Sequence, residues 1–117
     1  MLKAISLPVS TDASGDGSFT GPKVCGRLYA AQLVDGDFAD GVDITLTSED
    51  PNLSIPALAK LNFNTDQMVY PRVACALNTD GTGLTVYDMP VINGPIKAVI
   101  AQGGNAKSGS VIVFILE

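Results

Sequence analysis

The chain has 117 residues, of which 46% are hydrophobic and 16% charged, and its net charge is −5. This length predicts one domain, residues 1–117, whose core needs neither a metal nor a disulfide framework. The apolar content excludes a disordered tail. Only seven Lys and Arg residues occur, and they stand singly along the sequence. Because nucleic-acid phosphates are neutralised by clustered cations, no nucleic-acid partner is expected.

The N-terminal residues contain one Lys and a short apolar run, without the long apolar region of a signal peptide. No window approaches the roughly 20 apolar residues of a membrane helix, so no membrane partner is expected. The sequence therefore predicts synthesis and folding in a reducing cytoplasm. Cys25 and Cys75 each lie inside an apolar stretch, and two buried free thiols are favoured over a disulfide.

In the first third of the chain, residues 2–9 predict a strand in which Leu2, Ala4 and Leu7 alternate with Lys3 and Ser6. Residues 10–18 have the composition of a turn. Residues 23–34 predict a long strand. Gly26 within that strand indicates a bulge or a close approach of another backbone.

The middle of the chain predicts short strands between turns. After a turn at residues 35–41, residues 42–47 alternate cleanly, with Val42, Ile44 and Leu46 facing inward. A turn is expected at residues 48–52 and a short strand at 53–58. The only stretch with helical character is 55–61, where Pro56 leaves room for one turn. Residues 67–76 are expected to be extended but interrupted by Pro71, and a turn at 78–83 precedes a strand at 84–87.

The last third predicts a β-hairpin, with strands at residues 96–102 and 110–116 joined by the glycine-rich loop 103–109. Residues 111–116 are apolar at odd and even positions alike. Because side chains alternate between the two faces of a strand, both faces of this strand need cover. It is therefore expected to be central in a two-layer core or covered by another subunit. The whole chain predicts an all-β fold, a compact antiparallel β-sandwich or small barrel with little or no helix.

Residues that carry chemistry are few. The chain has no histidine, so triads that use a histidine base are excluded. The pair Lys107 and Ser108 lies on a loop tip, where a buried neutral lysine is hard to arrange. The acidic clusters at residues 12–16 and 35–40 lack the spacing of a calcium loop and are interpreted as turns. No catalytic residue, cofactor or metal ligand is predicted, and the protein is not expected to be an enzyme.

The surface offers better candidates. Residues 87–95 are apolar, irregular and punctuated by prolines, so they either plug the end of a sandwich or dock on a partner. The first strand can pair within the chain or on a neighbour. The candidate partner-binding residues are Tyr87, Met89, Pro90, Val91 and Ile92 of this segment, with Leu2 and Ile5 of the first strand.

Four segments carry a resemblance to a known family: STDASGDG at 10–17, GVDITLTSED at 41–50, YPRVA at 70–74 and IKAVIAQGGNAKSG at 96–109. The chain resembles the small head decoration proteins, or capsid cement proteins, of tailed bacteriophages, and residues 77–87 depart from that pattern. The resemblance implies a non-enzymatic, β-rich virion protein. Such a protein binds the outer surface of the major capsid protein shell, usually as a trimer, and stabilises it.

Other hypotheses remain open at the level of sequence. One is a phage tail or head–tail connector component. Another is a ligand- or carbohydrate-binding β-sandwich module, although the chain has no tryptophan and few aromatic residues to form a sugar platform. The last is a hydrolase that works with carboxylates alone. Tyr29, Tyr70 and Tyr87 are interpreted as half-buried strand residues with a polar tip.

Overall fold

The structure is a computed structural model that describes residues 1–50, 53–76, 78–83 and 85–117. These residues form only strands and loops, which confirms the predicted all-β class. The strands are β1 (Leu2–Ser10), β2 (Gly17–Val34), β3 (Asp43–Asp50), β4 (Leu53–Lys60), β5 (Gln67–Val69), β6 (Val73–Ala76), β7 (Thr85–Asp88), β8 (Val91–Ala101) and β9 (Ser108–Leu116). None of the described residues belongs to a helix that could traverse a lipid bilayer.

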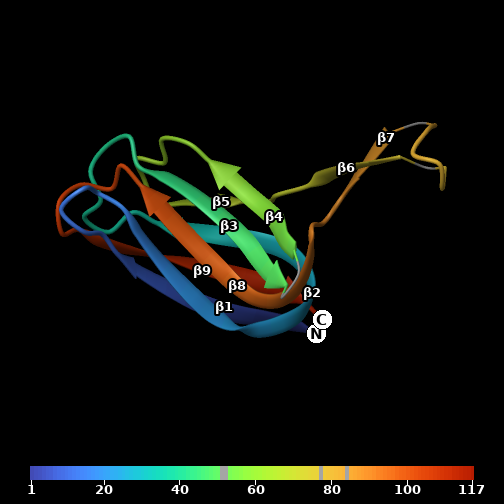
Figure 1. The fold of residues 1–117 in the computed structure, drawn as a ribbon, viewed down its shortest axis with the longest axis horizontal. Coiled ribbons are helices and arrows are strands. Elements are labelled where there is room, and N and C mark those ends of the chain that lie inside the picture. Colours follow the sequence, from blue (N-terminus) through green and yellow to red (C-terminus); the bar gives the residue numbers. More distant parts are fainter. Residues whose placement is uncertain (51–52, 77, 84) are drawn as a thin grey trace.

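Seven strands form one antiparallel sheet in the order β1-β9-β2-β8-β3-β4, with β5 also paired to β2. The 18-residue strand β2 pairs with different strands along its length. Its first part pairs with β8 and its second part with β9, and Arg27 pairs with both Val91 and Leu116. Near this point β2 bends, and the sheet folds over on itself (Figure 1). The result is sandwich-like. The first layer contains β1, β9, the second part of β2 and β5, and the second layer contains the first part of β2, β8, β3 and β4.

The core lies between the two layers and is built mainly by alternate residues of the strands of the main sheet. Val42, Ile44 and Leu46 are at most 1% exposed, which confirms the inward face predicted for residues 42–47. In β1 the buried residues are Ile5, Leu7 and Val9, whereas Leu2 and Ala4 are exposed. The apolar residues at the start of β1 therefore point away from the core.

The bend in β2 depends on Gly26. A Cβ atom at this position would lie 2.5 Å from the carbonyl oxygen of Leu116, so no other residue fits without displacing the β9 backbone. The pairing register of β2 shifts on either side, between Thr20 and Lys23 against β8 and between Leu28 and Ala30 against β9. The close backbone approach predicted at Gly26 is confirmed.

The predicted C-terminal hairpin is wrong. β8 and β9 follow each other in the chain but do not pair, because β2 lies between them in the sheet and the loop at 102–107 passes from one layer to the other. The central position of β9 is confirmed, since it is flanked by β1 and β2. Val111, Val113 and Ile115 are at most 1% exposed, but the opposite face of β9 is only half-buried.

Three further expectations need correction. Residues 55–60 are part of β4 rather than a helical turn, and the predicted turn at 48–52 is strand up to Asp50, with residues 51 and 52 outside the described part. Residues 87–95 are not irregular. Tyr87 is in β7, and β8 begins at Val91 and continues through Pro95.

The predicted strand at 84–87 corresponds to β7, and residue 84 lies outside the described residues.

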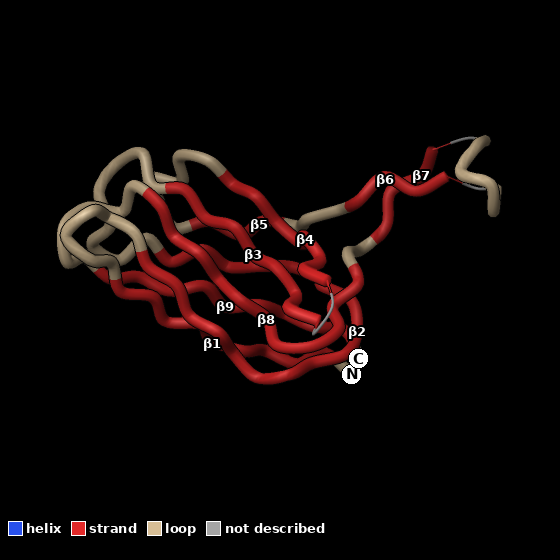
Figure 2. Tube along the Cα trace, viewed as in Figure 1, coloured by secondary structure: helices blue, strands red, loops and turns tan. Residues whose placement is uncertain are grey.

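β6 and β7 pair only with each other, in a two-stranded sheet separate from the main one. This arm, formed by the described residues from 73 to 88, leaves the body between β5 and β8 at the bend of β2 and projects away from it (Figure 2). Both chain termini lie at the same end, where the Glu117 amide donates to the carbonyl of Met1 over 3.0 Å. We call this the bend end. The loops at 11–16, 35–42, 61–66 and 102–107 gather at the opposite loop end (Figure 1).

Both cysteines are free thiols, but the prediction that they are buried is wrong. Cys25 follows the buried Val24 in β2, so its side chain projects from the opposite face of the strand and is exposed. Cys75 lies on β6 of the arm and is half-buried.

Candidate interaction surface

The outer faces of the two layers differ in chemistry. Residues directly opposite in an antiparallel ladder share a face. On the second layer one such row is Ser18, Val99 and Thr45, and the next is Thr20, Lys97 and Thr47. Lys97 Nζ also lies 3.9 Å from Glu49 Oε1. This face is mostly hydroxyl-bearing and charged, as is usual for a sheet face in contact with water.

The outer face of the first layer is mostly apolar, although Ser6, Arg27 and Gln32 also lie on it. One row runs through Leu2, Leu116, Arg27 and Val91, and Phe114 lies in the next row between Ala4 and Ala30. Leu2 is 50% exposed and Val91 is 58% exposed. We call this surface the apolar patch; its members are Leu2, Tyr29, Met68, Tyr70, Val91, Ile112, Phe114 and Leu116. A contiguous exposed patch of this kind marks an interaction surface more often than isolated apolar residues do.

A groove of about 200 Å³ crosses the apolar patch. It is lined by Leu2, Tyr29, Ala30, Met68, Tyr70 and Phe114. The rings of Tyr29 and Tyr70 meet edge to face, with centroids 6.0 Å apart, a favoured geometry for aromatic pairs. The two rings form one wall of the groove, and Arg72 contacts this wall at Tyr29. Arg72 Nη1 donates to the carbonyl of Tyr29 over 3.0 Å, and the guanidinium carbon lies 5.8 Å from the centre of the Tyr29 ring. The groove is therefore apolar inside and has a cation on its rim.

The arm is also apolar and exposed. Val73 is 39% exposed, Val86 44% and Tyr87 73%. In the β6–β7 ladder, Ala74 lies opposite Tyr87 and Cys75 opposite Val86, so Tyr87 and Val86 project from opposite faces of the arm. Asp80 and Asp88 are the only charged residues between 73 and 88. Hydrogen bonds from the Thr82 hydroxyl and amide lower the pKa of Asp80, so this position of the arm stays negative.

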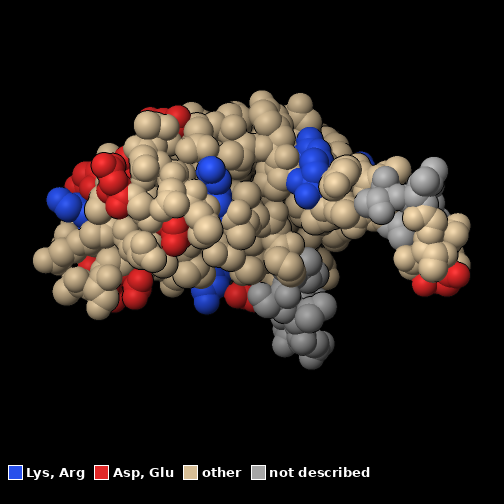
Figure 3. Space-filling view, turned by 90° about the horizontal axis from the view of Figure 1, so that it is seen from above, with Lys and Arg blue, Asp and Glu red and all other residues tan. Residues whose placement is uncertain are grey.

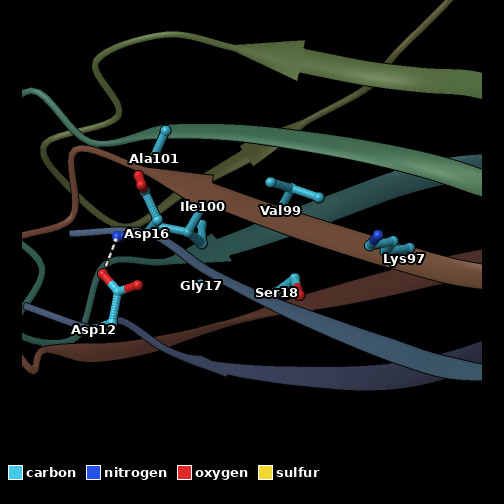
Figure 4. Close-up of a pocket in the computed structure, with 8 residues that line it drawn as sticks. All are labelled: Asp12, Asp16, Gly17, Ser18, Lys97, Val99, Ile100 and Ala101. Carbon is cyan, nitrogen blue, oxygen red and sulfur yellow. Dashed lines mark hydrogen bonds between the residues drawn. The ribbon is translucent and has the colours of Figure 1, made fainter. Parts of the chain in front are cut away.

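The second layer carries a shallow, open depression of about 360 Å³ (Figure 4). Its acidic residues are Asp12 and Asp16, and Lys97 lies at the far side. Asp12 Oδ1 accepts hydrogen bonds from the amides of Ser14 and Asp16, at 2.8 and 3.1 Å. The Asp12 carboxylate thus holds its own turn, which covers residues 11–16 of the predicted 10–18, since Ser10 belongs to β1 and Gly17 and Ser18 to β2. Among the residues that the structure describes, none that lines the depression is aromatic and could serve as a sugar platform.

The loop end is strongly acidic. Red atoms gather there in Figure 3, with few blue ones among them. The acidic residues at this end are Asp12, Asp16, Asp35, Asp37, Asp40, Asp43 and Asp66, and the basic ones are Lys60 and Lys107. Burial, together with the neighbouring carboxylates of Asp66, Asp40 and Asp37, raises the pKa of Asp35. Within the described ranges no group of three or more metal-ligating side chains is positioned to hold an ion.

The structure separates the seven predicted partner-binding residues. Leu2 and Val91 are exposed on the apolar patch, Tyr87 is exposed on the arm, and Met89 is half-buried at the root of the arm. Ile5, Pro90 and Ile92 do not fit the prediction. They are buried inside this chain. Ile5 and Ile92 are 8% and 0% exposed because they face the core from β1 and β8, and Pro90 is buried just before β8 begins.

Five residues of the groove are missing from the sequence prediction, namely Tyr29, Ala30, Met68, Tyr70 and Phe114. The tyrosines were expected to be half-buried, but Tyr29 is 42% and Tyr70 56% exposed. Phe114 could have been predicted as an interaction residue. It occupies an even position of residues 111–116, and these positions are apolar although they face away from the core. Met68 gives no such signal, because its face depends on the pairing of β5 with β2.

Comparison of the chain with family models, curated proteins and solved structures finds no match.

Proposed function

We propose that this protein is a non-enzymatic structural protein of a tailed-phage virion. It binds the outer surface of the major capsid protein shell as a decoration, or cement, protein, and it stabilises that shell as a homo-oligomer, in the form of a trimer. The proposal starts from the resemblance carried by residues 10–17, 41–50, 70–74 and 96–109. It places the protein on the capsid exterior after synthesis in the host cytoplasm.

The observation that carries the proposal is the contrast between the two outer faces. The first layer presents the apolar patch, whereas the second layer presents serine, threonine and lysine. A stably folded monomer gains nothing from an apolar outer face, and this face is continuous with the bend end from which the arm projects (Figure 1). Many copies on one shell add avidity, so each contact with the shell can be modest.

The test is to mix purified protein with phage capsids that lack it, and to measure co-sedimentation and the melting temperature of the shell. We expect saturable binding and a higher melting temperature. Val91→Glu and Val99→Glu are a matched pair, since both valines are exposed on β8 but only Val91 belongs to the apolar patch. Val91→Glu should weaken shell binding and Val99→Glu should leave it unchanged. Absence of binding by the wild-type protein would contradict the proposal.

A tail or head–tail connector component is a second candidate, and the projecting arm is the observation that favours it. An arm beside a sandwich-like body allows each copy to reach the next in a ring. Labelling the protein on intact virions, followed by negative-stain microscopy, separates the two candidates. Label over the whole head supports decoration, and label confined to the tail or neck supports the second candidate.

A further inference from the structure

We infer that the arm of one copy docks in the apolar groove of a neighbouring copy, with Tyr87 packed against the Tyr29–Tyr70 wall. The occupant of the groove is thus a second copy of this chain. The inference rests on the homo-oligomeric part of the proposed function and specifies how the copies are joined.

The arm is poorly supported within its own chain. Its two strands have four residues each and belong to a sheet of their own. An isolated two-stranded hairpin is at best marginally stable in water, and stability requires a third strand or a surface to pack against. Tyr87, at 73% exposed, has the most exposed aromatic ring among the large hydrophobic residues described. Packing on another molecule would supply the missing contacts.

The groove has the chemistry to receive such a side chain. Its walls are apolar, and its two tyrosine rings present an edge-to-face pair that a third ring can extend. Ala30 on its floor and Ala4 beside Phe114 are small, which leaves room over Phe114.

Charge complementarity points to the same pairing. The arm carries only negative charges, Asp80 and Asp88. The cations near the groove are Arg72 on its rim and Arg27 in the row of Leu2 and Val91. The loop end, by contrast, is acidic and repels both the arm and a second loop end (Figure 3). Association is therefore favoured at the bend end.

The geometry favours exchange between copies. Tyr70 lines the groove, and the arm begins three residues later and projects outward from the body (Figure 2). Arm and groove are different surfaces of one chain, so copies joined in one direction make heterologous contacts, and these form a ring when the rotation between neighbouring copies closes. In a ring of three copies, which is the proposed trimer, each arm occupies the groove of the next copy.

The experiment compares three substitutions that add the same charge to the full-length chain. Tyr87→Glu alters the arm, Met68→Glu alters the groove, and Val99→Glu alters the outer face of the second layer. All three side chains are exposed. Sedimentation velocity should show an oligomer for the wild type and for Val99→Glu. The other two variants should self-associate roughly 30-fold or more weakly, the loss typical of an interface hot spot.

A mixture of the Tyr87→Glu and Met68→Glu chains gives a sharper result. The intact arm of the second chain can enter the intact groove of the first, so we expect heterodimers but no ring. A monomeric wild type, unchanged association of both variants, or a mixture that stays monomeric would overturn the inference. Circular dichroism and melting curves check that each variant folds. If one does not, the smaller change Tyr87→Ser or Met68→Ser at the same position replaces it, and undiminished self-association of that variant would overturn the inference.

Shell binding, measured separately, distinguishes the two proposals. A monomeric protein that still binds capsids overturns the arm exchange and leaves the decoration function in place. A trimer joined by its arms that does not bind capsids overturns the decoration function and leaves the arm exchange in place.

Discussion

Ser48 Oγ donates a hydrogen bond of 2.6 Å to the carbonyl oxygen of Asn93 and accepts one of 2.7 Å from the Asn93 amide. Ser48 is 0% exposed and forms the last pair of the β3–β8 ladder, opposite Ile96. Its hydroxyl therefore extends the connection between β3 and β8 beyond the last ladder pair, toward the bend end.

Replacement of Ser48 by Ala should destabilise the fold by about 1–3 kcal/mol, because both hydrogen bonds are lost at a site that water reaches poorly. Urea unfolding monitored by circular dichroism measures the change. Ser18→Ala, on the exposed outer face of the second layer, is the matched control and should change stability by less than about 0.5 kcal/mol. Equal effects of the two substitutions would contradict the role given to Ser48.

Replacement of Gly26 by Ala should be more damaging, at about 2–4 kcal/mol, because the new methyl group meets the Leu116 carbonyl oxygen at 2.5 Å and the backbone of β2 or β9 must shift. Cys25→Ala, one position earlier and exposed, controls for a change of side chain at the bend. Thermal unfolding of the two variants tests this. A Gly26→Ala protein with the same melting temperature as the wild type would show that the β2 and β9 backbones are farther apart at Gly26 than the structure places them.

The two thiols should differ in accessibility. Cys25 is exposed on the body and should react promptly with a thiol reagent in the native protein, whereas the half-buried Cys75 should react more slowly. Mass spectrometry of peptides after short labelling times assigns the label to each cysteine. Strong protection of Cys25 would contradict its exposed position on the body.

The raised pKa of Asp35 predicts a pH dependence of stability. Just above the ordinary value of 3.8, folded Asp35 holds its proton while the unfolded chain has released it. The folded state then binds more protons, so the contribution of Asp35 to stability falls as the pH rises through this window. The carboxylate oxygen Oδ1 of Asp35 is also buried without a donor among the described residues.

Asp35→Asn should therefore raise the melting temperature near pH 7, by up to about 4 °C, and should have little effect near about pH 3, where the wild-type carboxyl is protonated in both states. Asp16→Asn removes a charge from the same loop end at an exposed position and is the control. A Tm difference between wild type and Asp35→Asn that is the same at both pH values would argue against this assignment.

Local features of the sequence determined much of the fold. The alternation of Val42, Ile44 and Leu46 identified a strand and its buried face. Gly26 identified a close backbone approach, because a glycine within an apolar strand leaves room for another backbone where a side chain would clash. The glycine and aspartate content of residues 35–41 identified a turn. Each of these signals lies within a few residues, so one sequence is enough to interpret it.

Pairing partners were decided only by the tertiary structure. Residues 96–116 have the composition of a hairpin, yet β2 separates β8 from β9, because an 18-residue strand that bends at Gly26 can pair with one strand before the bend and with the other after it. The same packing decides that Leu2 and Val91 share an exposed row while Ile5 and Ile92 are buried. Residue type specifies that a side chain is apolar, but whether it faces the core or a partner depends on contacts between segments far apart in the chain.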